Sequence, residues 1–232
     1  MGERRKGTIT GRAVRLQEQC GHGLRNAPLA LRPSPFRSCP HVREPKFLPP
    51  NPELDPMRIY LTGFMASGKS TVGPKAAARL GQPFLDLDRL ITAHDGRSIP
   101  TIFAEDGEEH FRELETQMLH RTTETADLVV ALGGGALVDD DNRAFAEEHG
   151  RVVYLEVPVA TILDRVVNDD TRRPLLEDES GTRLSREQQR TRIEEMLDER
   201  RTSYESAHHT LNADRPVAAV VTDLAQLAAN HS

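Results

Sequence analysis

The sequence is poor in cysteine and in aromatic residues. Its 232 residues include two Cys and no Trp, and aromatic residues make up 4% of the chain. Two cysteines cannot build a disulfide framework at this length, so we expect a reducing compartment, the cytoplasm. No window approaches about 18 consecutive apolar residues, which excludes a membrane-spanning helix. The net charge of −6 argues against nucleic acid as a partner of the whole surface.

The chain divides into two regions at Met57. Residues 1–56 carry a balance of +5 and hold both cysteines and 9 of the 15 prolines, whereas residues 57–232 carry −11. Prolines recur too often in the first region for a helix or a strand, so we expect a disordered Pro/Arg-rich extension. Met57 precedes the first apolar strand and suits a natural start equally well, in which case residues 1–56 are upstream sequence. Residues 57–232 form the one folded domain.

Short β-branched runs alternate with helical patterns after Met57, which is typical of βαβ units with a parallel sheet. The pattern therefore predicts an α/β fold with short connections and a polar loop at 169–186. The expected strands are 58–62, 83–87, 127–132, 152–156 and 210–212. The expected helices run to residue 80, over 89–123 with interruptions near Gly96 and Gly107, over 140–148, from Pro158, to about 201, and from Pro216.

A phosphate-binding motif lies between the first strand and the first helix. Residues 63–70 read GFMASGKS and fit G-x-x-x-x-G-K-S/T at the position where the mechanism requires it. The backbone N–H groups and the helix N-terminus form an anion cradle. Lys69 would neutralise charge on the β- and γ-phosphates, and the Ser70 hydroxyl would ligate magnesium. The motif indicates a nucleotide site without revealing the phosphoryl acceptor.

Two carboxylates end the second expected strand. Asp86 and Asp88 are two residues apart, so both are expected to project from the same side of an extended chain at the carboxyl edge of the sheet. One carboxylate near Mg²⁺ and one near an acceptor hydroxyl is the division that phosphoryl transfer needs. The structural alternative is that Asp88 only caps the following helix.

Three further features follow along the chain. Arg112 and Glu115 are three apart on a helix and can pair, which would orient the guanidinium for a carboxylate ligand. Three consecutive glycines at 133–135 would let a ligand approach bare backbone. Arg172 and Arg173 open the polar loop, where an arginine could close over a transferring phosphate. Taken singly, Arg112 is better explained as an ordinary surface arginine, and Arg172 and Arg173 as part of a solvated loop, whereas the glycines suit a tight turn equally well.

The order of these motifs resembles the shikimate kinase family over nearly all of residues 57–230. The resemblance rests on the GFMASGKSTVG loop, the D-x-D at 86–88, the G-x-S-I-x-x-I-F and G-E-x-x-F-R-x-x-E block, the GGG and the R-P-L-L segment. It implies a P-loop three-layer sandwich with a five-stranded parallel sheet of order 2-3-1-4-5, a lid loop and a helical substrate-binding segment. It also implies transfer of the ATP γ-phosphoryl group to the shikimate 3-hydroxyl, which feeds aromatic amino-acid synthesis, in a monomer.

The resemblance also implies a role for each matching residue. ATP would lie on the loop and beside a pair that flanks adenine, and these nucleotide-binding residues are Gly63, Ala66, Ser67, Gly68, Lys69, Ser70, Thr71, Arg165, Arg173 and Pro216. Ser70 and Asp86 would hold Mg²⁺. Shikimate would contact Asp88, Arg112, Gly133, Gly134, Gly135, Arg200, Phe103 and Phe111. Lys69, Asp88 and the lid residue Arg173 would be catalytic, with Asp88 helping to remove the proton of the acceptor hydroxyl.

The chain departs from the family pattern at two places. Ala66 stands where the family often has Gly. The family segment R-x-P-L-Y is here Arg200-Arg-Thr-Ser-Tyr204, and because Tyr204 keeps its spacing we assign the carboxylate contact to Arg200 rather than Arg201.

Three alternative functions remain open from the sequence. The first is another small-molecule P-loop kinase, such as a gluconate kinase, in which the Arg112 and Arg200 clamp would be lost. The second is a nucleotide-binding module without turnover. The third is a nucleic-acid adaptor that uses the basic residues of 1–56, which predicts salt-sensitive retention of DNA or RNA.

Overall fold

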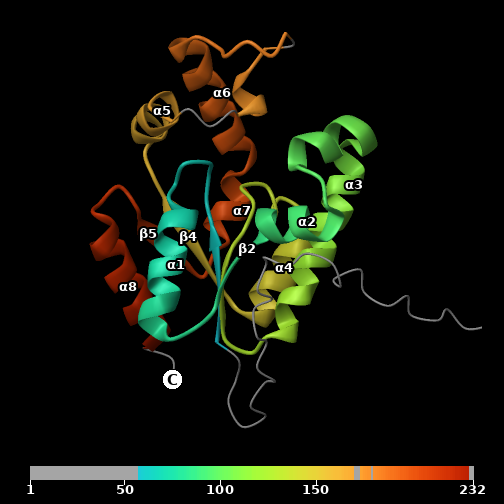
Figure 1. Ribbon diagram of the computed structural model, residues 1–232. Helices are drawn as coiled ribbons and strands as arrows, with labels where there is room; N and C mark the ends of the chain where they lie inside the picture. The colour runs from blue at the N-terminus through green and yellow to red at the C-terminus, as the bar shows by residue number, and fades with distance from the viewer. Residues whose placement is uncertain (1–56, 170–172, 179, 230–232) are drawn as a thin grey trace, which may run out of the picture. The chain divides into compact units, whose positions relative to one another are not determined.

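Five parallel strands form one sheet in the order β2-β3-β1-β4-β5 (Figure 1). This is the order implied by the family resemblance, and the expectation is confirmed. The computed structural model describes residues 57–169, 173–178 and 180–229, so the extension expected over 1–56 and Arg172 lie outside the described residues. The strands are β1 (Arg58–Thr62), β2 (Phe84–Asp86), β3 (Leu128–Ala131), β4 (Arg151–Glu156) and β5 (His209–Asn212).

Helices connect consecutive strands, as parallel pairing requires. They are α1 (Lys69–Leu80), α2 (Leu87–Asp95), α3 (Ile99–Arg121), α4 (Asp140–His149), α5 (Val159–Val167), α6 (Arg186–Glu199), α7 (Arg201–Glu205) and α8 (Val217–Ala229). Short 3-10 turns occupy Thr122–Glu124 and Pro174–Leu176. Over the described ranges, none of these helices has both the length and the apolarity needed to cross a bilayer.

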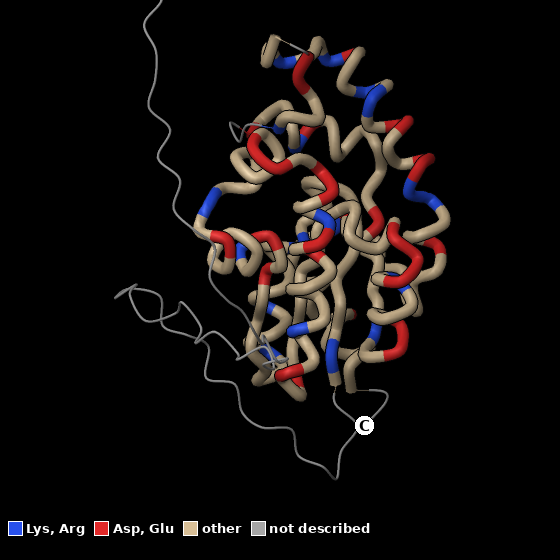
Figure 2. Tube along the Cα trace, turned by 90° about the vertical axis from the view of Figure 1, so that its right-hand side faces the viewer, with Lys and Arg blue, Asp and Glu red and all other residues tan. Residues whose placement is uncertain are grey.

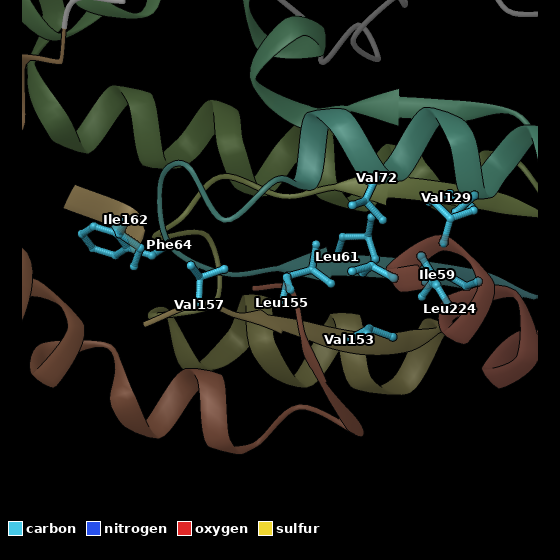
Figure 3. Close-up of a cluster of buried hydrophobic side chains, with 14 of the residues drawn as sticks. Ile59, Leu61, Phe64, Val72, Val129, Val153, Leu155, Val157, Ile162 and Leu224 are labelled. Atoms are coloured by element: carbon cyan, nitrogen blue, oxygen red, sulfur yellow. The ribbon is translucent and has the colours of Figure 1, made fainter. Parts of the chain in front are cut away.

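Helices cover both faces of the sheet, and alternate strand residues point to each cover. Ile59 and Leu61 of β1 pack in a core with α1 and α8, which includes Val72 and Leu224 (Figure 3). Tyr60, between them, belongs to a second core with residues of α2, α3 and α4. Because neighbouring side chains of a strand point to opposite faces, this alternation produces the expected three layers (Figure 1).

The second strand ends earlier than the sequence predicts. Asp86 is extended at φ −106° and ψ 119°, and its side chain accepts a hydrogen bond from the backbone N–H of Arg89, so it caps α2. The helix therefore begins at Leu87, and Asp88 lies in its first turn. The expectation that Asp86 and Asp88 both project from extended chain is wrong for Asp88, and the capping role considered for Asp88 belongs to Asp86.

Two helical stretches are interrupted beside the site. Gly96 caps α2 at φ 86°, and Gly107, at φ 82° and ψ 179°, breaks α3 into two helical segments, as expected at both glycines. The charged helix expected to run to about residue 201 is divided at Arg200, whose φ and ψ are −100° and 0°. Arg200 is therefore the junction between α6 and α7, and Arg201 is the first residue of α7.

Charges of both signs are interspersed along the described chain, as Figure 2 shows for α6 and its neighbours. Along α6 they form intrahelical pairs such as Arg190 with Glu194 at 3.0 Å. Such exposed pairs contribute little to stability. The carboxyl ends of β1, β2 and β3 instead open on the loops that carry the sequence motifs, and in an open α/β sheet this edge is where ligands bind.

Candidate active site

A cavity of about 960 Å³ lies at the carboxyl edge of the sheet. Its walls come from the loop after β1, the ends of β2 and β3, both segments of α3, the segment after Val167, and the residue between α6 and α7. The cavity brings together most of the residues singled out in the sequence, namely Ala66, Ser67, Gly68, Lys69, Ser70, Thr71, Asp86, Asp88, Phe103, Phe111, Arg112, Gly133, Gly134, Gly135, Arg165, Arg173 and Arg200.

The loop after β1 is shaped by residues with positive φ. Gly63 has φ +143°, and a Cβ there would lie 2.8 Å from the carbonyl oxygen of Leu155, so only glycine fits. Gly68, at φ 104°, caps the N-terminus of α1. Ala66 has φ 59°, the left-handed region in which alanine is uncommon. The departure from Gly at Ala66 therefore keeps the backbone conformation that glycine would adopt more readily.

Lys69 folds back over this loop. Its Nζ donates to the carbonyl oxygens of Gly63 at 2.6 Å and Phe64 at 3.0 Å. Burial of the ammonium group lowers the pKa of Lys69 to about 8, against the opposing effect of the Asp88 and Asp86 carboxylates. An anion placed on the loop would restore the charged form, since an opposite charge nearby favours it.

Ser70 and Asp86 are joined across the mouth of the loop. Ser70 Oγ donates to Asp86 Oδ2 at 3.0 Å, so a hydroxyl and a carboxylate oxygen lie beside the anion cradle. Hard oxygen ligands of this kind suit Mg²⁺. Within the described part of the chain no group of three or more His, Cys, Asp or Glu residues is arranged to hold a metal, and Mg²⁺ in kinase sites typically relies on substrate phosphates for its other ligands.

Asp88 lies between the loop and α3. Burial raises the pKa of the Asp88 carboxyl, and the Asp86 carboxylate raises it further, while Lys69 and Arg112 oppose the shift. Its carboxyl group therefore interacts electrostatically with a cation of the loop after β1 and with a cation of α3. A carboxylate with a raised pKa is a better proton acceptor than an ordinary aspartate.

Arg112 is held by two carboxylates. Its Nη1 lies 2.7 Å from Glu115 Oε2, and its Nη2 lies 3.0 Å from Glu108 Oε1. The Glu115 side chain is 1% exposed, and its burial raises the pKa of the carboxyl, with Arg112 acting against the shift. Arg112 also lies over the ring of Phe111, which packs on Phe103 with ring centroids 4.7 Å apart.

The three glycines after β3 lie against these charged groups. A Cβ on Gly133 would be 2.7 Å from Glu115 Oε1, one on Gly134 would be 3.3 Å from Arg200 Nη1, and one on Gly135 would be 3.4 Å from Arg112 Nη1. The glycines are therefore close-approach positions and not merely a tight turn.

Arg200 faces the cavity and Arg201 does not. Arg200 Nη1 donates to the Gly134 carbonyl oxygen at 3.1 Å, and its guanidinium lies 5.6 Å from the centroid of the Phe64 ring. Arg201 instead pairs with Asp198 at 2.8 Å, where both side chains are exposed. The geometry favours Arg200, rather than Arg201, as the arginine that faces the cavity together with Arg112.

Arg173 lines the cavity from the segment after α5. Its Nη2 lies 2.6 Å from Asp169 Oδ2, while its Nε is buried without a hydrogen-bond partner among the described residues. The pair sits at the base of the loop that the resemblance identifies as the lid, and the guanidinium retains a donor for an incoming anion.

Arg165 connects the loop after β1 to the turn after β5 by hydrogen bonds. Its Nη1 donates to the carbonyl oxygens of Ala66 at 2.9 Å and Ser67 at 3.4 Å, and its Nη2 donates to that of Ala213 at 3.2 Å. Pro216, expected beside adenine, is not among the residues that line the cavity, whereas its neighbours Arg215 and Val217 are.

Sequence reasoning missed the role of Tyr204 in the site. Its hydroxyl donates to the Gly134 carbonyl oxygen at 2.8 Å, the acceptor that Arg200 also uses, and its ring stacks on Tyr154 with centroids 4.7 Å apart. The available signal was that Tyr204 keeps the family's spacing from Arg200, and that spacing does not indicate a contact with Gly134. Arg89 and Ile99, which also line the cavity, carry no such signal.

Comparison with known proteins agrees with this geometry. The shikimate kinase family model matches residues 65–228. A shikimate kinase of Salinibacter ruber is 75% identical over 177 residues, which are 76% of this chain and 86% of the relative. One of Chlorobium limicola is 45% identical over 156 residues, which are 67% of this chain and 78% of the relative.

Solved structures give the same result. A shikimate kinase of Bacteroides thetaiotaomicron superposes with a TM-score of 0.68 at 33% identity, covering 74% of this chain and 97% of that one. A shikimate kinase of Acinetobacter baumannii in complex with shikimate superposes with a TM-score of 0.66 at 37% identity, covering 76% and 94%. Family model, sequence relatives and solved structures all agree that the chain belongs to the shikimate kinase family.

Proposed function

We propose that the chain transfers the γ-phosphoryl group of ATP to the 3-hydroxyl of shikimate, giving shikimate 3-phosphate and ADP. Membership of the family and the P-loop motif support the ATP-dependent kinase activity. The observation that supports the acceptor is the position of Asp88, which lines the same cavity as Lys69 and Arg112 and whose carboxyl group interacts electrostatically with both. The proposed phosphate site and the proposed carboxylate-binding cation would therefore act on one proton acceptor.

The nucleotide end of the cavity supplies charge neutralisation. The N-terminus of α1 and Lys69 would bind the β- and γ-phosphates, with Lys69 moving from the Gly63 and Phe64 carbonyl oxygens to the phosphates. Ser70 and Asp86 have the oxygen donors to hold Mg²⁺, which would neutralise charge between the β- and γ-phosphoryl groups. Arg173 would contact the transferring group from the lid segment.

The acceptor end supplies orientation. Arg112 and Arg200 would bind the shikimate carboxylate, and Gly133, Gly134 and Gly135 would let the ring approach the backbone. Phe103 and Phe111 would cover the ring. Positioning of this kind supplies most of the catalysis, since phosphoryl transfer leaves the protein little covalent work.

The chemical step needs one proton acceptor. The acceptor oxygen forms a bond to the γ-phosphorus as the bond from phosphorus to the β,γ-bridging oxygen breaks, and the leaving group is ADP. The proton of the acceptor hydroxyl would pass to the Asp88 carboxylate, whose raised pKa favours its uptake.

The test is ADP release from ATP in the presence of Mg²⁺, measured with shikimate, with gluconate and without acceptor. We expect release with shikimate alone, and its loss on chelation of the metal. Asp88→Asn should lower kcat by about 10²- to 10⁴-fold, the usual range for a general base. Equal rates with the three acceptor conditions would refute the proposed acceptor, whereas an unimpaired Asp88→Asn enzyme would refute only the role of that residue.

A further inference from the structure

The two carboxylates on Arg112 differ in their surroundings. Glu115 is 1% exposed and holds Nη1 at 2.7 Å, whereas the Glu108 side chain is 67% exposed and holds Nη2 at 3.0 Å. Removing one partner of a buried pair leaves an uncompensated charge and is strongly destabilising. An exposed pair four residues apart on a helix is weak and is screened by salt. Arg112 thus has one fixed counter-ion and one that can be replaced.

The break in α3 fixes where Glu108 lies. Gly107 leaves helical geometry at φ 82° and ψ 179°, and Glu108 opens the second helical segment, so Arg112 is one turn further on. On the other side of the break Asp106 pairs with Arg97 at 2.6 Å. The chain therefore has a charged pair on each side of Gly107, and Glu108 contacts Arg112 at Nη2.

An acceptor carboxylate would have to share the Arg112 guanidinium with Glu108 and Glu115. A guanidinium binds a carboxylate through two N–H donors in a fixed fork. Arg112 Nη1 donates to Glu115, which lies against Gly133. Arg112 and Glu115 line the cavity, whereas Glu108 does not, and the Arg112 side chain is 40% exposed, so a carboxylate bound in the cavity would compete with the exposed Glu108 for the charge of Arg112.

We infer that Glu108 is an internal counter-anion that the carboxylate of the acceptor replaces on Arg112, and that this competition tunes the affinity for the acceptor. The inference rests on the proposed function, because it takes the acceptor to be a carboxylic acid. An anionic acceptor keeps Arg112 neutralised after the exchange. A neutral acceptor carries no charge that could replace Glu108, so Nη2 stays paired with Glu108. An inorganic anion must compete with the Glu108 carboxylate.

The test compares Glu108→Gln with Glu109→Gln in the full-length protein. Glu109 is the exposed neighbour, so both variants change the net charge equally and only one removes the pair with Arg112. Calorimetry measures binding of shikimate, of its uncharged methyl ester and of ATP, at low and at high salt.

We expect Glu108→Gln to bind shikimate about two-fold more tightly than Glu109→Gln at low salt, the scale of one exposed helix pair. The difference should disappear at high salt. Affinities for the methyl ester and for ATP should not separate the two variants. KM for shikimate should fall in the same proportion while KM for ATP stays the same.

Three results would overturn the inference. One is equal shikimate binding by both variants at low salt, and another is tighter binding of the methyl ester by Glu108→Gln. The third is weaker shikimate binding by Glu108→Gln, which would mean that Glu108 supports the orientation of Arg112. Wild-type protein that bound ATP but not shikimate would refute the proposed function itself, and the two failures are therefore distinguishable.

Discussion

A single methyl group added at Gly133 should damage the acceptor side of the site and leave the nucleotide side intact. Gly133 is not one of the described glycines with positive φ, so Gly133→Ala is compatible with the backbone. The added Cβ would lie 2.7 Å from Glu115 Oε1 and 3.3 Å from Asp88 Oδ1. Both contacts are shorter than an ordinary van der Waals separation of about 3.5 Å.

The magnitude follows from what Glu115 must give up. Its carboxylate is the end of a flexible side chain and can retreat by about half an ångström or more, but that movement disturbs the 2.7 Å pair with Arg112. A hydrogen bond to a charged group contributes about 1.5–3 kcal/mol, and about 1.4 kcal/mol corresponds to ten-fold in affinity. We therefore expect KM for shikimate to rise about ten-fold or more, with KM for ATP within about two-fold of wild type.

Steady-state kinetics with each substrate varied in turn measures this difference. Gly135→Ala is the comparison, because its Cβ would lie 3.4 Å from the Arg112 guanidinium and should produce a smaller rise. In a double-mutant cycle, Gly133→Ala and Glu115→Gln should be strongly non-additive, since both act on one ion pair. Equal KM values for shikimate in Gly133→Ala and Gly135→Ala, or additive effects in the cycle, would refute the reasoning.

Two further predictions address the two ends of the cavity. Arg112→Ala removes a charged hydrogen-bond donor from the acceptor, so shikimate affinity should fall about ten- to hundred-fold while ATP affinity is retained; calorimetry that found equal weakening of both ligands would contradict the assignment. Lys69 has its pKa lowered to about 8 by burial, and bound phosphates should raise it again. ATP binding at about pH 8 should therefore take up protons, and less so at about pH 6.5, where Lys69 is already protonated in the free protein. Calorimetry in buffers of different ionisation enthalpy counts these protons, and an uptake independent of pH would be contrary to expectation.

Much of the nucleotide side could be predicted from the sequence because its chemistry resides in the backbone. The run from Gly63 to Ser70 fixes a loop whose N–H groups bind anions whatever surrounds it. The parallel sheet likewise follows from alternating strands and helices, which short-range patterns reveal, whereas the strand order was implied by the family resemblance. The error at Asp88 arose where two local rules compete, since Asp86 can end a strand or cap a helix, and the cap prevailed.

The acceptor side was less predictable because its geometry depends on which side chains the tertiary fold buries. The pairing of Arg112 with Glu115 follows from helix spacing, but the burial of Glu115 depends on Gly133, which reaches it only through the tertiary fold. Tyr204 contacts Gly134 across a sequence separation of 70 residues, and no local pattern encodes such a contact. Pro216 does not line the cavity, whereas its neighbours Arg215 and Val217 do, and its place beside adenine stays a prediction.

Arg165 couples two loops that are far apart in the sequence. One planar cation joins the carbonyl oxygens of Ala66 and Ser67, in the loop after β1, to that of Ala213, which precedes α8. Because the guanidinium is rigid, a displacement of the turn at Ala213 would be transmitted to the loop at Ala66 and Ser67.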